Sequence, residues 1–288
     1  MTANKAKNDL KLSTELNGVV DSLVTASTKG GSLTEDDIQS YYDTLVESQK
    51  SDYANDVTYN SDRNGGELIV YNPEGYRAVK QVLIKFDDDQ STRYSELTST
   101  LSTLNDELEA ATTPAEEAAD DTADTAETVE SRPVEDIVAD IAEINGELDA
   151  LYAELMPEVN EVIDAFNAGT TIQDLIDQYN DDPGMQQEPT VSQGYAVSET
   201  STTWDPSFTA GAMSIAEPGQ LSDPIQGSYG IYIIYYDHDI VSGPVALDEV
   251  RDSIAQIVES NLKSDAYSAA LTDWMAEADP QYFLDNMK

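Results

Sequence analysis

The stretch GSYGIYIIYY, from Gly227 to Tyr236, constrains the fold of this chain more than any other. Apolar and aromatic residues occupy nearly every position on both faces of the pattern, which is typical of a buried strand. Tyr232 lies in the middle of that strand. A buried phenol usually finds a polar partner, so the contacts of its hydroxyl group become a question about function.

The composition sets the size of the protein and excludes one class of partner. A chain of 288 residues with 40% hydrophobic residues can form two domains, or one domain with a large insertion. Its 57 acidic and 14 basic residues give a formal net charge of -43. Because such a field repels polyanions, nucleic acid and anionic membrane surfaces are not expected as partners.

Several kinds of catalytic site are missing from the sequence. There is no cysteine, and the only histidine, His238, lies in the acidic sequence YYDHD, where we expect it to be solvated. The motifs GxSxG, HExxH, GxGxxG and GxxxxGK[ST] are absent, as is the spaced EF-hand loop. We therefore expect no cofactor and no metal. No stretch is long and apolar enough for a membrane span, and the first residues do not resemble a signal peptide, so an exported protein would have had that segment removed.

Both ends of the chain have helical patterns. A first helix is predicted around Leu10, Leu16, Val19, Val20 and Leu23. A second is predicted to begin at Thr34, an N-cap with Asp37 three residues later, with Ile38, Tyr41, Tyr42 and Leu45 on one face. The turn-rich sequence TYNSDRNGGELIVYNPEG follows. The tail is predicted to form one helix from Leu247 and another around Tyr267, Leu271 and Trp274, and these helices are expected to pack on the N-terminal ones.

The middle of the chain begins with a predicted buried strand, YRAVKQVLIKF, and continues into a heptad-like seam. The seam consists of Leu97, Leu101, Leu104 and Leu108, and then of Val134, Ile137, Ile141, Ile144, Leu148, Leu151 and Leu155. The acidic segment between its two arms has almost no large apolar residue and predicts a flexible tip. Tyr94 to Leu155 is thus interpreted as an antiparallel helical hairpin inserted into a domain. A disordered linker throughout is the alternative.

The hairpin is followed by helical and turn-rich segments. Pro157 is predicted to start a new helix that ends before Gly169, and a short helix is predicted to carry Leu175 and Ile176. A polar, turn-rich passage covers 180–203. The helical stretch PSFTAGAMSI, a turn and the buried strand come next.

In their order, these segments resemble the parvulin family of peptidyl-prolyl isomerases, as arranged in PrsA-like and SurA-like extracytoplasmic foldases. YRAVKQVLIKF is similar to the first strand of that family, and FNAGTTIQDLIDQYNDDPG to its segment G-x-x-F-x-x-L-A-x-x-Y-S-x-D. SQGYAV resembles GG-x-LG, and GQLSDPI followed by YGIYII resembles the last turn and strand. The resemblance covers roughly a hundred residues without the insertion. It implies an α+β fold with a four-stranded antiparallel sheet surrounded by helices.

The resemblance also implies a site for an X-Pro peptide bond. Trp204 and Phe208 stand where the family cradles the proline ring, with Met213 and Leu221 behind them. A core role is the favoured interpretation of Met213 and Leu221, and Phe208 could equally be a core residue. Ala196, in SQGYAV, is a further substrate-binding candidate. Asp182 stands at a position that faces the prolyl amide, and an exposed loop carboxylate is its alternative reading.

Two positions depart from the family. Where its members usually carry a histidine on each of two central strands, this chain has Gln81 and Tyr232. With Asp182 they are the catalytic candidates, because all three can hydrogen bond. The expected function is a weakened prolyl isomerase that acts on unfolded or secreted polypeptides outside the cytoplasm. The alternative is a chaperone that holds peptides without catalysis, and a purely structural surface protein ranks last.

The predicted domain organisation combines these observations. Residues 1–72 form an N-terminal helical, chaperone-like segment, and residues 73–240 form a parvulin-like domain. Residues 91–155 of that domain are an acidic, coiled-coil and flexible insertion. Residues 241–288 are C-terminal helices that pack on the N-terminal segment.

Overall fold

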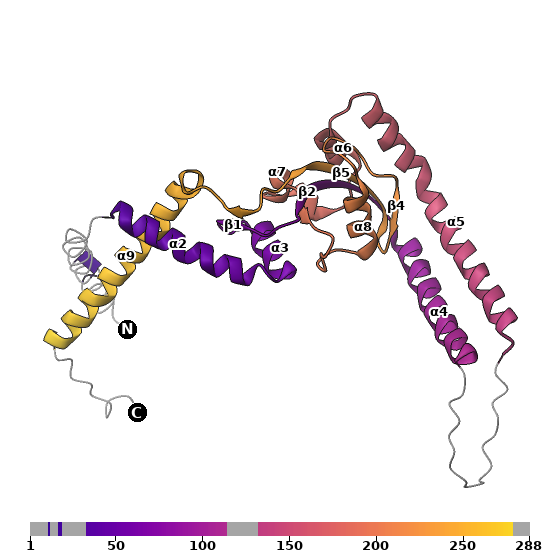
Figure 1. The fold of residues 1–288 in the computed structure, drawn as a ribbon, viewed down its shortest axis with the longest axis horizontal. Coiled ribbons are helices and arrows are strands. Elements are labelled where there is room, and N and C mark those ends of the chain that lie inside the picture. The colour runs from indigo at the N-terminus through magenta and orange to yellow at the C-terminus, as the bar shows by residue number, and fades with distance from the viewer. Residues whose placement is uncertain (1–10, 12–16, 19–32, 114–131, 279–288) are drawn as a thin grey trace, which may run out of the picture. The chain divides into compact units, whose positions relative to one another are not determined.

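The computed structural model describes residues 11, 17–18, 33–113 and 132–278 (Figure 1). They form two compact units. The first contains the described residues up to Asn55, Glu67–Glu74 and the described residues from Ser242 onward, and the second contains Asp56–Gly66 and Gly75–Val241. Most of the predicted first helix, around Leu10 to Leu23, and most of the acidic tip of the insertion lie outside the described residues.

The first unit is built from segments near both ends of the chain. Helix α2 (Glu35–Asp52) packs against α9 (Leu247–Ala278), and β1 (Tyr71–Asn72) pairs antiparallel with β6 (Gly243–Pro244). Its small core consists of Ile38, Val46, Val70, Val250, Ile254 and Val258. The predicted packing of the tail on the N-terminal segment is confirmed. The predicted break within the tail is wrong: α9 is one continuous helix, because no glycine or proline interrupts it.

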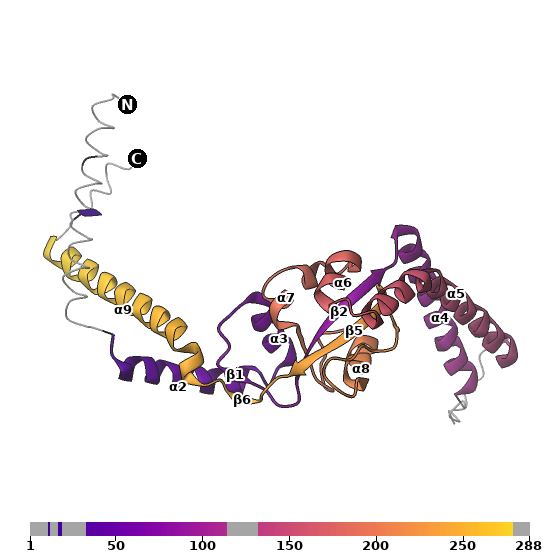
Figure 2. The same cartoon turned by 90° about the horizontal axis from the view of Figure 1, so that it is seen from above.

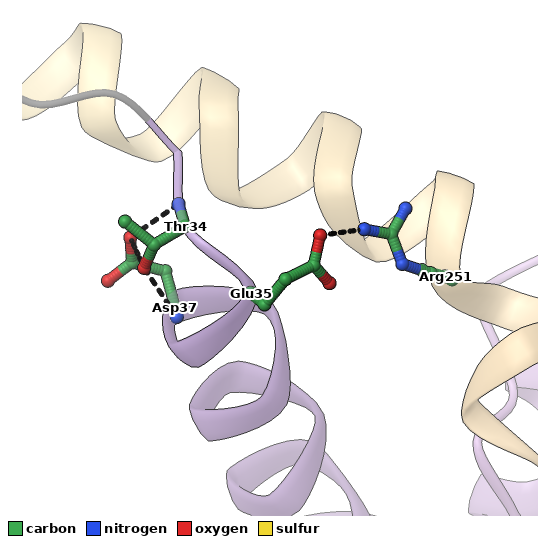
Figure 3. A network of polar contacts seen from close by, with 4 residues as sticks. All are labelled: Thr34, Glu35, Asp37 and Arg251. Carbon is green, nitrogen blue, oxygen red and sulfur yellow. Dashed lines mark hydrogen bonds and ion pairs between the residues drawn. The ribbon is translucent and has the colours of Figure 1, made fainter.

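The start of α2 is fixed as its sequence predicts (Figure 3). The Asp37 N–H donates to Thr34 Oγ1 (3.2 Å), and the Thr34 N–H donates to Asp37 Oδ2 (2.9 Å), so both groups of the capping box are paired. One residue further on, Glu35 forms an ion pair with Arg251 of α9. The cap and the ion pair together define where α2 begins beside α9.

The second unit contains a four-stranded antiparallel sheet in the order β3-β2-β5-β4. Its strands are β2 (Arg77–Lys85), β3 (Tyr195–Val197), β4 (Ile225–Gly227) and β5 (Gly230–Asp239). The predicted fold class is therefore confirmed. The predicted single strand from Gly227 to Tyr236 is in fact a hairpin turn followed by β5. Gly230 has φ 143°, and a Cβ there would lie 2.1 Å from the Ile84 carbonyl oxygen, so the turn requires glycine.

Helices α4 (Asp88–Thr112) and α5 (Val134–Asn167) form the predicted hairpin and lie side by side in both views (Figures 1 and 2). Leu97, Leu104 and Ile137 are buried along its seam. At the inner end, Tyr94 and Tyr152 pack against Phe86 of the sheet core, with ring centroids 5.4 and 5.2 Å from its ring. The inner ends of the insertion predicted at 91–155 are thus part of the domain core.

The predicted helix start at Pro157 is wrong, because α5 runs through this residue to Asn167. Proline lacks the N–H that would bond to the carbonyl of Ala153. Both residues are exposed, so water can solvate that carbonyl. Val159 and Val162 continue the buried face of Leu155, and this packing carries the helix across the proline.

Two passages predicted to be turns contain regular structure. Residues 56–65 form α3 (Asp56–Gly65). This helix lies in the second unit and not in the predicted N-terminal segment 1–72. Tyr59 is fully buried, and an Arg63 guanidinium N–H donates to the Gln193 carbonyl (2.9 Å), so tertiary contacts stabilise this polar helix. The passage 180–203 contains the 3-10 helix η1 (Pro183–Gln186), the short helix α7 (Thr190–Gln193) and β3.

The remaining helices agree with the sequence. Helix α6 (Ile172–Tyr179) buries Leu175 and Ile176, and α8 (Pro206–Ser214) buries Phe208. None of the helices in the described ranges combines the length and apolarity that crossing a bilayer requires.

Candidate functional site

One face of the sheet opens into a groove of about 590 Å³, which lies entirely within the second unit. Because side chains alternate along a strand, Gln81 and Leu83 of β2 point to the same side. The register pairs Leu83 with Tyr232 of β5, and Val79 with Tyr195 of β3. Gln81, Leu83, Tyr195 and Tyr232 consequently all line the groove.

Asp182 reaches the groove because its segment runs along the edge of β2. Beyond the point where β3 ends, the Asp181 N–H donates to the Leu83 carbonyl (3.0 Å), and the Leu83 N–H donates to Asn180 Oδ1 (2.9 Å). These bonds extend the sheet edge by a short distance. They place the next residue, Asp182, beside Gln81.

The Asp182 carboxylate is the centre of a polar cluster. Its Oδ2 accepts hydrogen bonds from Gln81 Nε2 (2.7 Å) and from the Tyr195 hydroxyl (2.8 Å), and its Oδ1 accepts one from the Gly184 N–H (2.9 Å). Burial raises the pKa of Tyr195, and the negative charge of Asp182 raises it further. Tyr195 therefore remains a proton donor to the carboxylate at neutral pH.

The side-chain amide oxygen of Gln81 has no hydrogen-bond donor among the described residues. A carboxylate can only accept, so the amide of Gln81 must turn its Nε2 toward Asp182. Its Oε1 is buried and has no hydrogen-bond partner among the described residues. Among the described side chains of the Asp182 cluster, this is the buried polar atom that has no hydrogen-bond partner.

An aromatic wall extends from the polar cluster, because Tyr195 belongs to both. The rings of Tyr195, Trp204, Phe208 and Tyr232 follow one another with centroid distances of 4.4, 5.8 and 5.4 Å. Trp204 is held in place by its Nε1, which donates to the Ala196 carbonyl (2.9 Å). The wall offers a ring-lined surface against which an apolar group can pack.

Tyr232 is the last ring of this wall, next to Phe208. Burial raises its pKa to about 12, the negative charge of Asp205 adds to the effect, and a hydrogen bond with Ser228 opposes it. The hydroxyl therefore stays protonated at neutral pH. Gly227 lies directly against the ring: a Cβ at this position would come within 2.1 Å of Tyr232 Cε2.

A second carboxylate, Asp205, borders the groove at the start of α8. Its Oδ1 accepts from the Ser207 N–H (2.8 Å), as an N-cap does, and its Oδ2 accepts from the Ser228 hydroxyl (2.7 Å) and N–H (3.1 Å). Burial raises the pKa of Asp205, but the hydrogen bonds from Ser228, Ser207 and Phe208 outweigh burial and hold it below its usual value. Asp205 is consequently ionised at neutral pH.

The structure brings together five of the eight residues that the sequence indicated: Gln81, Asp182, Trp204, Phe208 and Tyr232 all line the groove. The other three do not. Ala196 is fully buried, and Leu221 pairs with Tyr235 through an isolated bridge. Met213 lines a separate cavity of about 570 Å³, which shares Trp204 and Pro206 with the groove.

Sequence reasoning missed seven residues of the lining: Leu83, Tyr195, Thr203, Asp205, Pro206, Ser228 and Tyr229. Three of them lie in segments that the sequence marks. The pair Asp205-Pro206 is an N-cap followed by proline at the first helical position, which marks a helix start facing the site. Tyr195 lies in SQGYAV, the segment that resembles GG-x-LG, directly before the candidate Ala196.

Comparisons with known proteins give structural matches only. No protein-family model matches the sequence, and no curated protein matches it. The solved structures that match include one from work on PEB4 and Cj1289, two SurA-like chaperones of Campylobacter jejuni (11% identity, 96% of this chain and 73% of that chain, TM-score 0.34). Others are PrsA of Bacillus anthracis, a peptidylprolyl isomerase (13%, 93% and 99%, TM-score 0.28), and PrsA of Bacillus subtilis (12%, 99% and 90%, TM-score 0.29).

These matches extend over almost the whole chain. The chain is similar, in its mixed helical and antiparallel architecture, to SurA-like and PrsA structures.

Proposed function

We propose that the groove of the second unit binds an extended, proline-containing segment of an unfolded polypeptide and accelerates cis-trans isomerisation of its X-Pro bond. The observation that carries this proposal is that one groove is lined both by the aromatic wall of Tyr195, Trp204, Phe208 and Tyr232 and by the Asp182 cluster. The wall suits the prolyl ring. The cluster suits the amide that precedes it.

The chemistry requires no bond to be broken. Rotation about an X-Pro amide has a barrier of about 18 to 20 kcal/mol, while the isomers differ by about 0.5 to 1 kcal/mol. In the twisted amide the nitrogen gains electron density and the carbonyl oxygen loses negative charge. A catalyst must therefore stabilise this charge distribution better than that of the planar forms.

The residues of the groove match that requirement. Tyr232, with a pKa raised to about 12, can donate a hydrogen bond to the electron-rich nitrogen. The negative charge of Asp182 near the carbonyl oxygen disfavours the planar amide more than the twisted one. Neither contribution transfers a proton, so the absence of histidine from the positions of Gln81 and Tyr232 weakens catalysis without removing it.

Clients and location follow from the resemblance of the sequence motifs to extracytoplasmic foldases. We include in the proposal that the clients are unfolded or secreted polypeptides and that the protein acts outside the cytoplasm.

The test is NMR exchange spectroscopy on a short Ala-Pro peptide. The protein should accelerate exchange above buffer, and Tyr232→Phe should reduce the acceleration about threefold to tenfold, the equivalent of one hydrogen bond. Tyr235→Phe is the matched control, because Tyr235 lies on the same strand but outside the groove lining, near Phe166 of α5. An exchange rate equal to that in buffer would exclude catalysis.

A second candidate function is peptide holding without catalysis. The presence of Gln81 and Tyr232 at positions where the related family carries histidines favours it. This function predicts suppression of aggregation of a denatured protein by the full chain, with Tyr232→Phe as effective as the unaltered protein. A chain that accelerates exchange but leaves aggregation unchanged would argue against holding.

A further inference from the structure

We propose that the groove selects X-Pro segments that carry a lysine or arginine next to the proline. The inference rests on the proposed function, since the same groove would bind both the prolyl ring and the cation. It concerns the charge of the peptide and not the rate of isomerisation, so the two can fail separately.

The charges that line the groove are all of one sign. Asp182 and Asp205 both border it, and among its described lining residues none is lysine, arginine or histidine. Both carboxylates act on the same point, because the negative charge of each raises the pKa of Tyr232. A cation bound near Tyr232 would therefore interact favourably with both carboxylates, and an anion there would be repelled by both.

Gln81 independently points to a ligand that donates hydrogen bonds. Its side chain is only 6% exposed, it lines the groove, and its Oε1 has no partner among the described residues. Flipping the amide would not help, since Nε2 must face the Asp182 carboxylate. A buried acceptor is costly to leave unpaired, and a small shift of the Gln81 side chain would present it to an ammonium or guanidinium group in the groove.

The aromatic residues add a third favourable contact. Tyr229 is 61% exposed at the edge of the groove, and Trp204 forms part of its wall. The faces of such rings attract cations, and tryptophan and tyrosine attract them more strongly than phenylalanine. The long stem of a lysine or arginine could pack along these rings while its charge reaches the carboxylates.

The experiment compares peptides that differ only in charge beside the proline. Two matched series place lysine, alanine or glutamate either directly before or directly after it. We would measure kcat/KM by NMR exchange and Kd by NMR titration, using the full chain. In at least one series the lysine peptide should be preferred over the glutamate peptide by about tenfold, and about 0.5 M salt should reduce the preference.

Variants locate the source of the preference. Asp205→Asn removes the charge but keeps a residue that caps a helix well, and it should reduce the lysine-over-glutamate ratio about threefold. Glu158→Gln is the control, because it makes the same change of net charge on an exposed position of α5 outside the groove lining. It should leave the ratio unchanged.

The outcomes separate the two proposals. Equal values for lysine and glutamate peptides in both series would overturn the inference and leave isomerisation standing. If no peptide exchanges faster than in buffer but lysine peptides still bind more tightly in a manner that depends on Asp205, catalysis fails and the inference holds. A preference that Glu158→Gln weakens as much as Asp205→Asn would assign selection to the whole acidic surface and overturn it.

Discussion

Asp56 and Asp182 are both partly enclosed carboxylates of the second unit, and each accepts hydrogen bonds from several groups. Asp56, at the start of α3, accepts from the hydroxyls of Tyr76 (2.8 Å), Ser201 (2.9 Å) and Thr203 (2.6 Å). It also accepts from two backbone N–H groups, of residues 202 and 203. Asp182 instead accepts from Gln81, Tyr195 and a backbone N–H.

The two residues differ in where their partners lie. The partners of Asp56 belong mainly to the loop that leads into Trp204, so this carboxylate fixes the course of the chain. Two partners of Asp182 line the groove, and one of them, Gln81, retains an unpaired acceptor. We propose that the position of the partners and their unpaired acceptor mark Asp182 as a functional carboxylate, and that Asp56 is a structural one.

The largest expected effect is on stability at Asp56. Asp56→Ala removes the acceptor of three hydroxyls, two backbone N–H groups and the Asn60 side-chain amide, and it should lower the free energy of unfolding by about 3 kcal/mol, measured by urea denaturation. Asp181→Ala is the control, since the carboxylate of Asp181 accepts a long bond from the Lys85 N–H (3.2 Å) and should cost less than about 1 kcal/mol. Equal losses in the two variants would remove the structural role of Asp56.

The second effect is on activity at Asp182. Asp182→Asn removes the charge but allows Gln81 to flip, so that its Oε1 accepts from the new amide. Stability should therefore change by less than about 1 kcal/mol, whereas the acceleration of exchange should fall about tenfold. If Asp182→Asn lost stability in proportion to activity, the contrast with Asp56 would not stand.

A third effect appears at high pH. Burial, followed by the hydrogen bond with Asp56, raises the pKa of Tyr76 to about 12, above its unfolded value of about 10. The folded state thus favours the neutral phenol. This contribution to stability is fully present below pH ~10 and is lost as the pH rises toward ~12. Urea midpoints at several alkaline pH values should fall less steeply for Tyr76→Phe than for the unaltered chain, and parallel curves would contradict this assignment.

The smallest effect is expected in the outer part of the hairpin, residues 98–143, which contributes neither to the contacts of Asp56 nor to those of Asp182. Deleting 98–143 with a short turn keeps Tyr94 and Tyr152 in the core, and should leave both the unfolding of the second unit and the exchange activity nearly unchanged. Deleting 94–155 removes both tyrosines and Leu155, and should abolish cooperative unfolding, as followed by circular dichroism. If both deletions unfolded, the outer hairpin would be part of the core as well.

Much of the fold could be predicted where local pattern and burial agree. The apolar runs of β2 and β5, the capping box of Thr34 and the seam of α4 and α5 are such cases. Strands β3 and β4 have three residues each, too few for a periodic signal. Helix α3 reads as a turn because its sequence is polar, and only tertiary contacts of Tyr59 and Arg63 show why it is helical.

The site was less predictable, because strand alternation decides which neighbour faces the groove. SQGYAV suggests Ala196 as a substrate-binding residue. In the structure Tyr195 points toward Asp182, so the side chain of Ala196 must point to the other side of the sheet. Asp205 and Ser228 come together across a separation of 23 residues, which no local pattern encodes. The family resemblance located the right segments, and the register was needed to select the residues.

The continuity of α5 through Pro157 gives the hairpin a mechanical property. A helix of 34 residues is about 50 Å long. The same continuous helix forms the outer arm and, through Val159 and Val162, packs in the sheet core. No loop separates the two parts. A load applied to the outer arm would therefore be transmitted through α5 to the domain interior.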